Sequence, residues 1–403
     1  MQEKGLVRFF EQFLNKTSLF VNKSVLQAQY TPEKILHRDK QIADVASILA
    51  PSLKGDRPSN LFIYGKTGTG KSLVAKYTTD KINEVAQQRS LPVKIVYINC
   101  KLKKVADTEY RLVAQLCKEF GREVPPTGLP TDEIYRIFYG ALDRQKQVVI
   151  LILDEIDELV DKAGDELLYN LTRINGELKN AQICLVGISN SVTFTETLDP
   201  RVKSSLSEEE LVFPPYDALQ LQDILRDRAE KAFSAGVIQA GVIEKCAARA
   251  ASDNGDARHA IDIFRVAGEL AERRDEKTLA LAHLDIAEET IEKDRMLEVV
   301  RTQPKQHQAA LYAILNVCGQ KAGAVFTGEI YDWYQKICEQ TKLRPLTQRR
   351  VSDIIAEFDM LGLITARVIS KGRYGRTREI SLAIPAHNSN RMRQVLEEGL
   401  ALA

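Results

Sequence analysis

The chain has 403 residues, a formal net charge of +1 and six cysteines, and 44% of its residues are hydrophobic while 28% are charged. These values are ordinary for a water-soluble protein of two or three domains. No CxxC pair, signal peptide or membrane-length apolar run is present, so we expect a cytoplasmic protein with buried free thiols, and we exclude a disulfide scaffold and a membrane-spanning protein.

Continuous apolar runs alternate with helical stretches in the first half of the chain. The runs are LFIY (61–64), VKIVYINC (93–100), VVILILDE (148–155) and AQICLVGIS (181–189). Such runs are typical of strands buried on both faces of a parallel sheet. Residues 1–216 are therefore predicted to form an N-terminal segment and an α/β nucleotide-binding domain, with a parallel sheet flanked by helices.

The segment GKTGTGKS follows the first of these strands and opens a helix. Its glycines let backbone N–H groups turn toward phosphates, and the helix N-terminus favours negative charge. We expect Lys71 to reach the β- and γ-phosphates of ATP and the Ser72 hydroxyl to bind Mg²⁺. The alternative is a glycine-rich turn without a ligand. The predicted contacts to ATP or ADP here are Gly65, Lys66, Thr67, Gly68, Thr69, Gly70, Lys71 and Ser72.

Two further strands end in polar residues. Asp154 ends the third run and is expected in the Mg²⁺ shell, while Glu155 would polarise the attacking water. Asn190 ends the fourth run and could orient that water. The alternatives are an acidic helix cap after the third strand and a plain turn asparagine after the fourth.

After FPPY (213–216) the apolar residues follow helical spacing, which predicts a helical domain over residues 217–296. Within it, the stretch GDARHAIDIFRVAGELA contains Arg258. On the residues alone, Arg258 is either a functional cation or a surface cation paired with Asp256 or Asp262.

The P-loop, the Asp-Glu strand end, the Asn strand end and the helical domain together resemble the AAA+ ATPases. The resemblance implies that Asn190 is sensor one and that Arg258 is sensor two, placed against the γ-phosphate. It also implies that LDPRVKSSL (198–206) is the arginine-finger segment and that Arg201 is the finger. The family often carries Ser-Arg where this chain has Ser204 and Ser205.

Residues 297–386 are predicted to contain three helices and a two-stranded hairpin, which is the layout of a winged helix. Residues 301–385 hold thirteen Lys and Arg against seven Asp and Glu, a balance suited to a polyanion. The alternative is a protein-binding winged helix with a solvated charged loop. The expected DNA contacts lie at the start of the third helix and on the hairpin: Gln348, Arg349, Arg350, Ser352, Lys371, Arg373, Tyr374 and Arg376. Residues 387–403 are expected to form a C-terminal tail.

TPEKILHRDKQIADVASILAP (31–51), VFPPY, GDARHAIDIFR and the C-terminal unit together resemble the archaeal replication initiators of the Orc/Cdc type. The resemblance covers about residues 16 to 385. It implies that His37 and Arg38 border the nucleotide on its adenosine side, where the residues alone suggest a surface pair. Tyr216 is grouped with these nucleotide contacts. It also implies a DNA-touching helical segment over residues 104–129.

We therefore expect an ATP-dependent initiator that binds double-stranded origin DNA and is associated with the nucleoid. The resemblance implies slow ATP hydrolysis as a switch, recruitment or loading of the MCM helicase, and contacts with paralogous initiators on DNA. Two other classes stay open. One is a P-loop signalling or transcription regulator with a winged-helix module, and the other is a clamp-loader-like AAA+ motor.

Overall fold

The computed structural model describes residues 18–27, 29–101, 108–125, 128–191, 193–206, 208–321, 325–370, 376–383 and 386–402. The chain divides into two compact units, Met1–Leu284 and Asp285–Ala403, and the boundary falls inside helix α13 (Leu281–Thr302). We call residues 18–216 of the first unit the base and residues 217–284 the lid. No helix in these ranges is long and apolar enough to cross a membrane.

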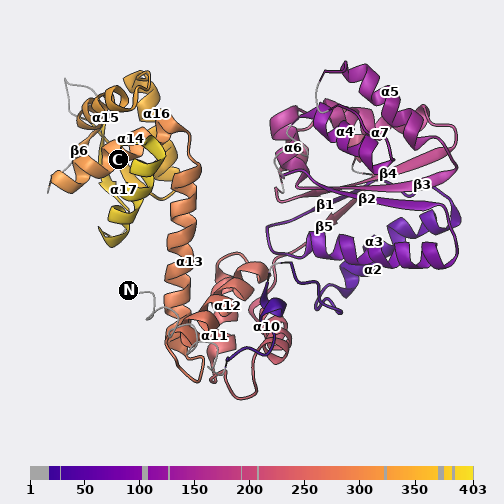
Figure 1. The fold of residues 1–403 in the computed structure, drawn as a ribbon, viewed down its shortest axis with the longest axis horizontal. Helices are drawn as coiled ribbons and strands as arrows, with labels where there is room; N and C mark the ends of the chain where they lie inside the picture. Colours follow the sequence, from indigo (N-terminus) through magenta and orange to yellow (C-terminus); the bar gives the residue numbers. More distant parts are fainter. Residues whose placement is uncertain are drawn as a thin grey trace, which may run out of the picture. The chain divides into compact units, whose positions relative to one another are not determined.

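The base is built on a five-stranded parallel sheet of order β2-β3-β4-β1-β5 (Figure 1). Its strands are β1 (Leu61–Tyr64), β2 (Val93–Asn99), β3 (Gln147–Asp154), β4 (Ala181–Ser189) and β5 (Glu209–Val212). Nearly every residue of β3 and β4 is buried, which explains their continuous apolar runs. The register sets Tyr64 beside Ser189 and Asp154 beside Ile188. The residues that follow β1, β3 and β4 therefore meet at one edge of the sheet.

Helices cover both faces of this sheet (Figure 1). One buried cluster packs α2 (Asp39–Leu49) and α3 (Lys71–Gln88) on one face. A second cluster packs helices on the other face: α4 (Glu109–Glu119), α5 (Thr131–Leu142), α6 (Ile156–Ala163), α7 (Glu166–Arg173), α8 (Phe194–Thr197) and α9 (Pro200–Leu206). Short 3₁₀ turns complete the base, namely η2 (Ala50–Lys54) and η3 (Ile174–Gly176).

The lid contains α10 (Ala218–Ala232), α11 (Val242–Ser252), α12 (Ala257–Arg273) and the start of α13. Asp217 begins α10 with a capping box to Gln220, and the Asp256 carboxylate caps α12 by accepting the backbone N–H of His259. The N-terminal turn η1 (Lys23–Leu26) packs against α10 and α12, and the Phe20 ring lies 4.5 Å from that of Phe233.

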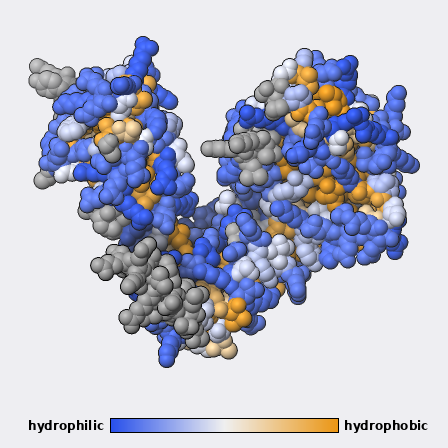
Figure 2. Space-filling model, in the orientation of Figure 1, coloured by the Kyte–Doolittle hydropathy of each residue, from blue (hydrophilic) through white to orange (hydrophobic). Residues whose placement is uncertain are grey.

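The second unit is a winged helix. It contains α14 (Lys305–Gln320), α15 (Thr327–Thr341) and α16 (Gln348–Met360), followed by the hairpin β7 (Ile364–Ser370) and β8 (Arg376–Leu382). The strand β6 (Val325–Phe326) adds to β8, so the antiparallel sheet has the order β6-β8-β7. The face visible in Figure 2 is mainly hydrophilic, as expected when each unit buries its own core.

A last helix, α17 (Ala386–Leu400), occupies the segment that the sequence suggested as a tail. Its residues Met392, Leu396 and Leu400 are buried in the core of the second unit. The Tyr312 hydroxyl of α14 donates a 2.8 Å hydrogen bond to Glu397. This segment is therefore a structural part of the winged-helix unit.

Candidate nucleotide site and nucleic-acid interface

The P-loop runs from the end of β1 to the start of α3. Thr67, Gly68, Gly70, Lys71 and Ser72 line one cavity, and Thr69 lies buried behind them. Gly68 has φ +68°, and a Cβ built there would lie 1.7 Å from Oδ1 of Asp256 in the lid. Only glycine combines this backbone conformation with so close an approach. Gly65 and Lys66 precede the cavity lining, and their carbonyls face Lys71.

The side chain of Lys71 is held by the backbone of the P-loop. Its Nζ donates hydrogen bonds to the carbonyls of Gly65 at 2.8 Å and Lys66 at 2.7 Å, and the residue is only 4% exposed. Burial lowers the pKa of Lys71 to about 8, although Asp154 and other nearby carboxylates oppose this shift. The ammonium therefore lies against the backbone of the P-loop, beside the cavity that Lys71 lines.

Asp154 ends β3 and is almost fully buried. The Tyr97 hydroxyl donates to Oδ2 of Asp154 and also contacts Ser72, and burial together with Asp154 raises the pKa of Tyr97. Mg²⁺ in nucleotide sites is usually held by one or two protein oxygens together with phosphates. The Ser72 hydroxyl and the Asp154 carboxylate line the same cavity and supply such oxygens, so the residues fit the ion.

Glu155 follows Asp154 with a left-handed backbone, φ +58°. Burial raises the pKa of its carboxyl, and the Nζ of Lys101 lies 3.9 Å from its Oε2. Asn190 lines the same cavity from the end of β4, and its backbone N–H donates to the carboxylate of Asp157. The structure therefore brings together the carboxylate pair and the amide that the sequence placed at one sheet edge.

The lid closes over this edge through the N-terminus of α12. The backbone N–H of Ala257 donates to the Gly68 carbonyl at 3.2 Å, and the Lys66 Nζ donates to Oδ1 of Asn254 at 2.5 Å. Arg258, the next residue of α12, lines the cavity beside the P-loop. The cavity is therefore bounded by the base on one side and by α12 of the lid on the other.

Sequence reasoning missed the far end of the cavity. This part of the lining includes the cations Lys34 and Arg228, and it also has apolar and aromatic side chains from the N-terminal segment and the lid: Tyr30, Ile35, Leu36, Ile224 and Ile261. The Arg228 guanidinium lies 4.4 Å from the centre of the Tyr30 ring. Apolar and aromatic side chains of this kind suit an organic ring such as adenine. In the sequence these residues are indistinguishable from ordinary helix-core positions.

His37 and Arg38 lie outside the described lining of this cavity, in contrast to the adenosine-side position that the resemblance implied. The His37 Nε2 lies 3.0 Å from Asp223 of α10. Arg38 is buried and contacts the outer side of the P-loop. Tyr216, which was grouped with them, does line the cavity.

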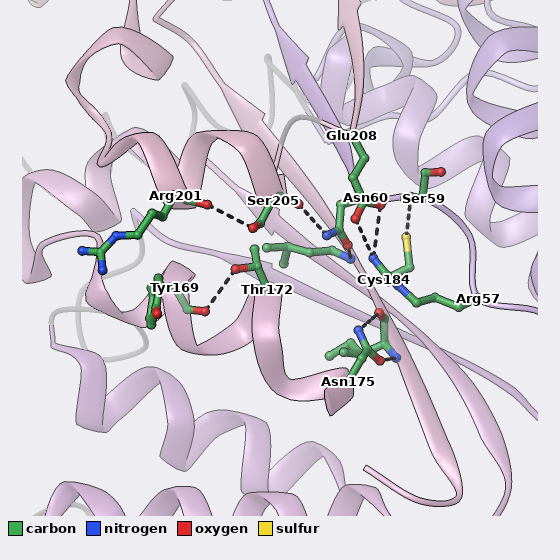
Figure 3. Close-up of polar contacts among 12 residues, drawn as sticks. Arg57, Ser59, Asn60, Tyr169, Thr172, Asn175, Cys184, Arg201, Ser205 and Glu208 are labelled. Carbon is green, nitrogen blue, oxygen red and sulfur yellow. Dashed lines mark hydrogen bonds and ion pairs between the residues drawn. The ribbon is translucent and has the colours of Figure 1, made fainter. Parts of the chain in front are cut away.

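The candidate arginine finger, Arg201, lies on α9. Its side chain is exposed, pairs with Asp199 at 3.1 Å and extends away from Ser205 and Asn60 (Figure 3). Buried Asn60 donates to the Ser205 carbonyl at 2.8 Å, so the end of α9 is fastened to the start of β1. Arg201 is not among the described residues that line the cavity of its own chain.

The predicted DNA-reading helix is α16. Thr347 caps it, Gln348, Arg349 and Arg350 are exposed in its first turn, and Ser352 is half-buried. Arg376 begins β8, whereas Lys371, Arg373 and Tyr374 lie outside the described residues. The Nη1 of Arg378 donates to the Ser352 carbonyl at 2.8 Å and joins the hairpin to α16.

Comparison with known proteins gives a consistent result along most of the chain. Family models match an AAA domain at residues 55–192, a Cdc6 AAA+ ATPase-type lid domain at 222–289 and a CDC6 C-terminal winged helix domain at 298–390. The ORC1-type DNA replication protein of Pyrococcus abyssi is 51% identical over 387 residues, which are 95% of this chain and 92% of the relative. The ORC1-type DNA replication protein 1 of Methanosarcina acetivorans is 50% identical over 394 residues, 97% of this chain and 94% of the relative.

The solved structure of the Aeropyrum pernix ORC1 protein in complex with DNA is similar, with a TM-score of 0.83 and 43% identity, and covers 95% of this chain and 98% of that one. Cdc6p from Pyrobaculum aerophilum shares the fold, with a TM-score of 0.59 at 20% identity over 96% of this chain and 99% of its own. The chain therefore belongs to the family of ORC1-type DNA replication proteins, AAA+ ATPases that end in a winged helix.

Proposed function

We propose that this protein is an ATP-dependent replication initiator that binds double-stranded origin DNA. The observation that carries the proposal is the combination, in one chain, of a cavity lined by the P-loop and a winged helix whose first α16 turn exposes Gln348 and Arg349. The Aeropyrum pernix ORC1 protein, which aligns over 95% of this chain, was solved in complex with DNA. This relationship supports the same class of ligand here.

In the proposed nucleotide site, Lys71 holds the β- and γ-phosphates, and Ser72 and Asp154 hold Mg²⁺. The ion would neutralise charge that develops on the phosphates. Glu155 accepts a proton from the attacking water, and its raised pKa suits that role because a weakly acidic carboxyl is a better base. Asn190 orients the water and Arg258 contacts the γ-phosphate from the lid. We propose that the protein is a weak ATPase whose slow hydrolysis acts as a nucleotide switch.

Arg201 is exposed on its own chain, which suits a residue that acts on a neighbour. An arginine finger supplied in trans stabilises transition-state charge on another subunit's nucleotide. We therefore propose that Arg201 acts as an arginine finger on the nucleotide of a paralogous initiator bound beside this protein on DNA. The ion pair between Arg201 and Asp199 would have to break first.

On DNA, the first turn of α16 would enter the major groove, where Gln348 and Arg349 can meet base edges and Arg350 a phosphate. The hairpin residues Lys371, Arg373, Tyr374 and Arg376 would grip the backbone or the minor groove. Residues 104–129, which include α4, are a second proposed DNA contact. The MCM helicase is the proposed protein partner, recruited or loaded at the bound origin.

Duplex binding tests the DNA proposal. Arg349→Ala should weaken binding to origin DNA by about tenfold to a hundredfold if Arg349 makes a bidentate base contact, and should relax specificity at that base. Arg391→Ala, which removes an exposed arginine of α17 in the same unit, is the matched control. Equal weakening by the two variants would mean that α16 contributes only net charge.

Footprinting of the full chain on DNA from its own genome tests the initiator role. Protection of a repeated sequence beside a replication start supports the proposal. Protection at promoters, with no affinity for MCM, would instead identify a transcription regulator. Recognition of DNA structure without sequence preference would identify a clamp-loader-like motor.

A further inference from the structure

Arg38 is a buried cation directly before α2. The residue is 2% exposed, and its hydrogen-bond partners are two backbone carbonyls and the side chain of Tyr216. Its Nε donates to the Thr69 carbonyl at 3.0 Å, and its Nη2 donates to the Pro214 carbonyl at 2.7 Å. Its guanidinium carbon also lies 3.8 Å from the centre of the Tyr216 ring. One planar group thus touches the P-loop and the segment that leads into the lid.

The bond to Thr69 fixes the orientation of one peptide group. A trans peptide is planar, so the Thr69 carbonyl and the Gly70 N–H point in opposite directions. Because the carbonyl faces Arg38 outside the loop, the Gly70 N–H faces the inner side of the loop. Gly70 lines the nucleotide cavity, and inward N–H groups of a P-loop are the donors that hold phosphates.

The other contacts hold the connection between base and lid. Pro214 and Tyr216 belong to the linker between β5 and α10, and the Tyr216 N–H donates to the Gly255 carbonyl at 3.2 Å, directly before α12. The Tyr216 hydroxyl lies 3.0 Å from where a Cβ of Gly70 would be. A shift of this linker would therefore also displace the peptide group between Thr69 and Gly70.

We propose that Arg38 is a positioning residue that holds the 69–70 peptide of the P-loop in its phosphate-binding orientation and couples that orientation to the base–lid linker. The inference rests on the proposed ATP-binding function and deepens it. The resemblance implied that Arg38 lies at the adenosine end of the nucleotide. The proposed role instead places Arg38 at the phosphate end, where Arg38 acts through Gly70 and does not contact the nucleotide.

Guanidinium chemistry explains why an arginine occupies this position. A guanidinium is planar, presents donors in several directions and stacks on aromatic rings, whereas a lysine ammonium cannot bridge two carbonyls and stack at once. Burial lowers the pKa of Arg38, so the site holds the charged form against a desolvation cost. Lysine should therefore replace it only in part.

The test separates the two ends of the nucleotide. ATP, tripolyphosphate and adenosine compete with a fluorescent ADP analogue on the full chain, for the wild type, Arg38→Ala, Arg38→Lys and Arg57→Ala. Arg57 is the control because it is a partly buried arginine that pairs with Glu208 and does not belong to the described cavity lining. Thermal unfolding checks that each variant is folded. If Arg38→Ala does not fold, the comparison is made with Arg38→Lys instead.

For Arg38→Ala we expect the affinities for ATP and tripolyphosphate to fall together by about tenfold to a hundredfold, the loss typical of a charge-assisted hydrogen bond. Adenosine affinity should stay within about twofold, a shift too small for a lost hydrogen bond. Arg38→Lys should show a smaller loss in the same two ligands. Arg57→Ala should match the wild type.

Three results would overturn the inference. Loss of adenosine affinity with unchanged tripolyphosphate affinity would make Arg38 an adenosine contact. Equal loss of all three ligands would make it a general structural residue, and no loss would make it dispensable. Failure of the ATP proposal is recognised separately, because the wild type would then bind ATP no better than Lys71→Ala.

Discussion

Nucleotide affinity should depend on pH through Lys71. Its ammonium donates to two carbonyls of its own loop, and burial lowers its pKa to about 8. Phosphate binding needs the charged ammonium, since a neutral amine offers little attraction to a polyanion. Above pH 8, binding must therefore include uptake of a proton, and the affinity should fall as the pH rises.

The size of the effect follows from this pKa. Between pH 7.5 and 9, the charged fraction of a group with pKa about 8 falls from about three-quarters to about one-tenth, so the Kd for ATP should rise about eightfold. The terminal phosphate, with a pKa of about 6, is ionised throughout this range. Burial raises the pKa of Cys100 to about 12 and also raises that of Tyr97. Neither neighbour therefore titrates in the window.

Isothermal titration with a non-hydrolysable ATP analogue and Mg²⁺, at constant ionic strength and several pH values, measures the effect. Lys71→Met is the control, because it should bind weakly and show a flat profile. Repeating the wild-type titration in two buffers of different ionisation enthalpy reveals the proton taken up. A flat wild-type profile, or the same slope in Lys71→Met, would refute the assignment of this proton to Lys71.

Two further predictions concern stability. Met392→Ala should destabilise the second unit by about 2–5 kcal/mol because it empties a fully buried position of α17. Denaturation followed by Trp333, the chain's single tryptophan, measures this, and an unchanged midpoint would mean that α17 is dispensable. Gly68→Ala should lower the Tm and the ATP affinity because the added Cβ would clash with Asp256. The control is Gly236→Ala: Gly236 has φ +77° and no atom within 4 Å of an added Cβ, so this variant should show only a backbone strain of about 1–2 kcal/mol. Equal effects of the two glycine variants would rule out that contact.

The clustering of Lys71, Asp154 and Asn190 around one cavity was predictable because its signals are local. Lys71 is marked by the spacing of its loop, and Asp154 and Asn190 each follow a continuous apolar run. Parallel strands end at one sheet edge, so strand ends that are far apart in the sequence can be placed together from the sequence pattern alone. The same rule does not extend to the lid, whose helices reach the cavity from more than sixty positions after Asp154.

The contacts of Arg38 with the P-loop and the linker were not predictable because two of its partners are backbone carbonyls, which every residue carries. No sequence pattern around Thr69 or Pro214 indicates that their backbone carbonyls accept hydrogen bonds from a distant guanidinium. Tyr30 and Ile224 were missed for a related reason, since the sequence pattern does not distinguish an apolar side chain that packs in a core from one that lines a cavity. Strand β5 also gave no signal, because its side chains are mostly exposed and form no apolar run.

The contact between α12 and the P-loop has a consequence for how these proteins diverge. The N–H of Ala257 and the carbonyl of Gly68 both belong to the main chain. Residue 257 can therefore be substituted during evolution without loss of this hydrogen bond. Such a contact leaves no pair of co-varying residues and is invisible to methods that infer proximity from sequence alignments. Its trace in an alignment would be a single invariant column, the glycine at position 68, whose missing side chain admits Asp256.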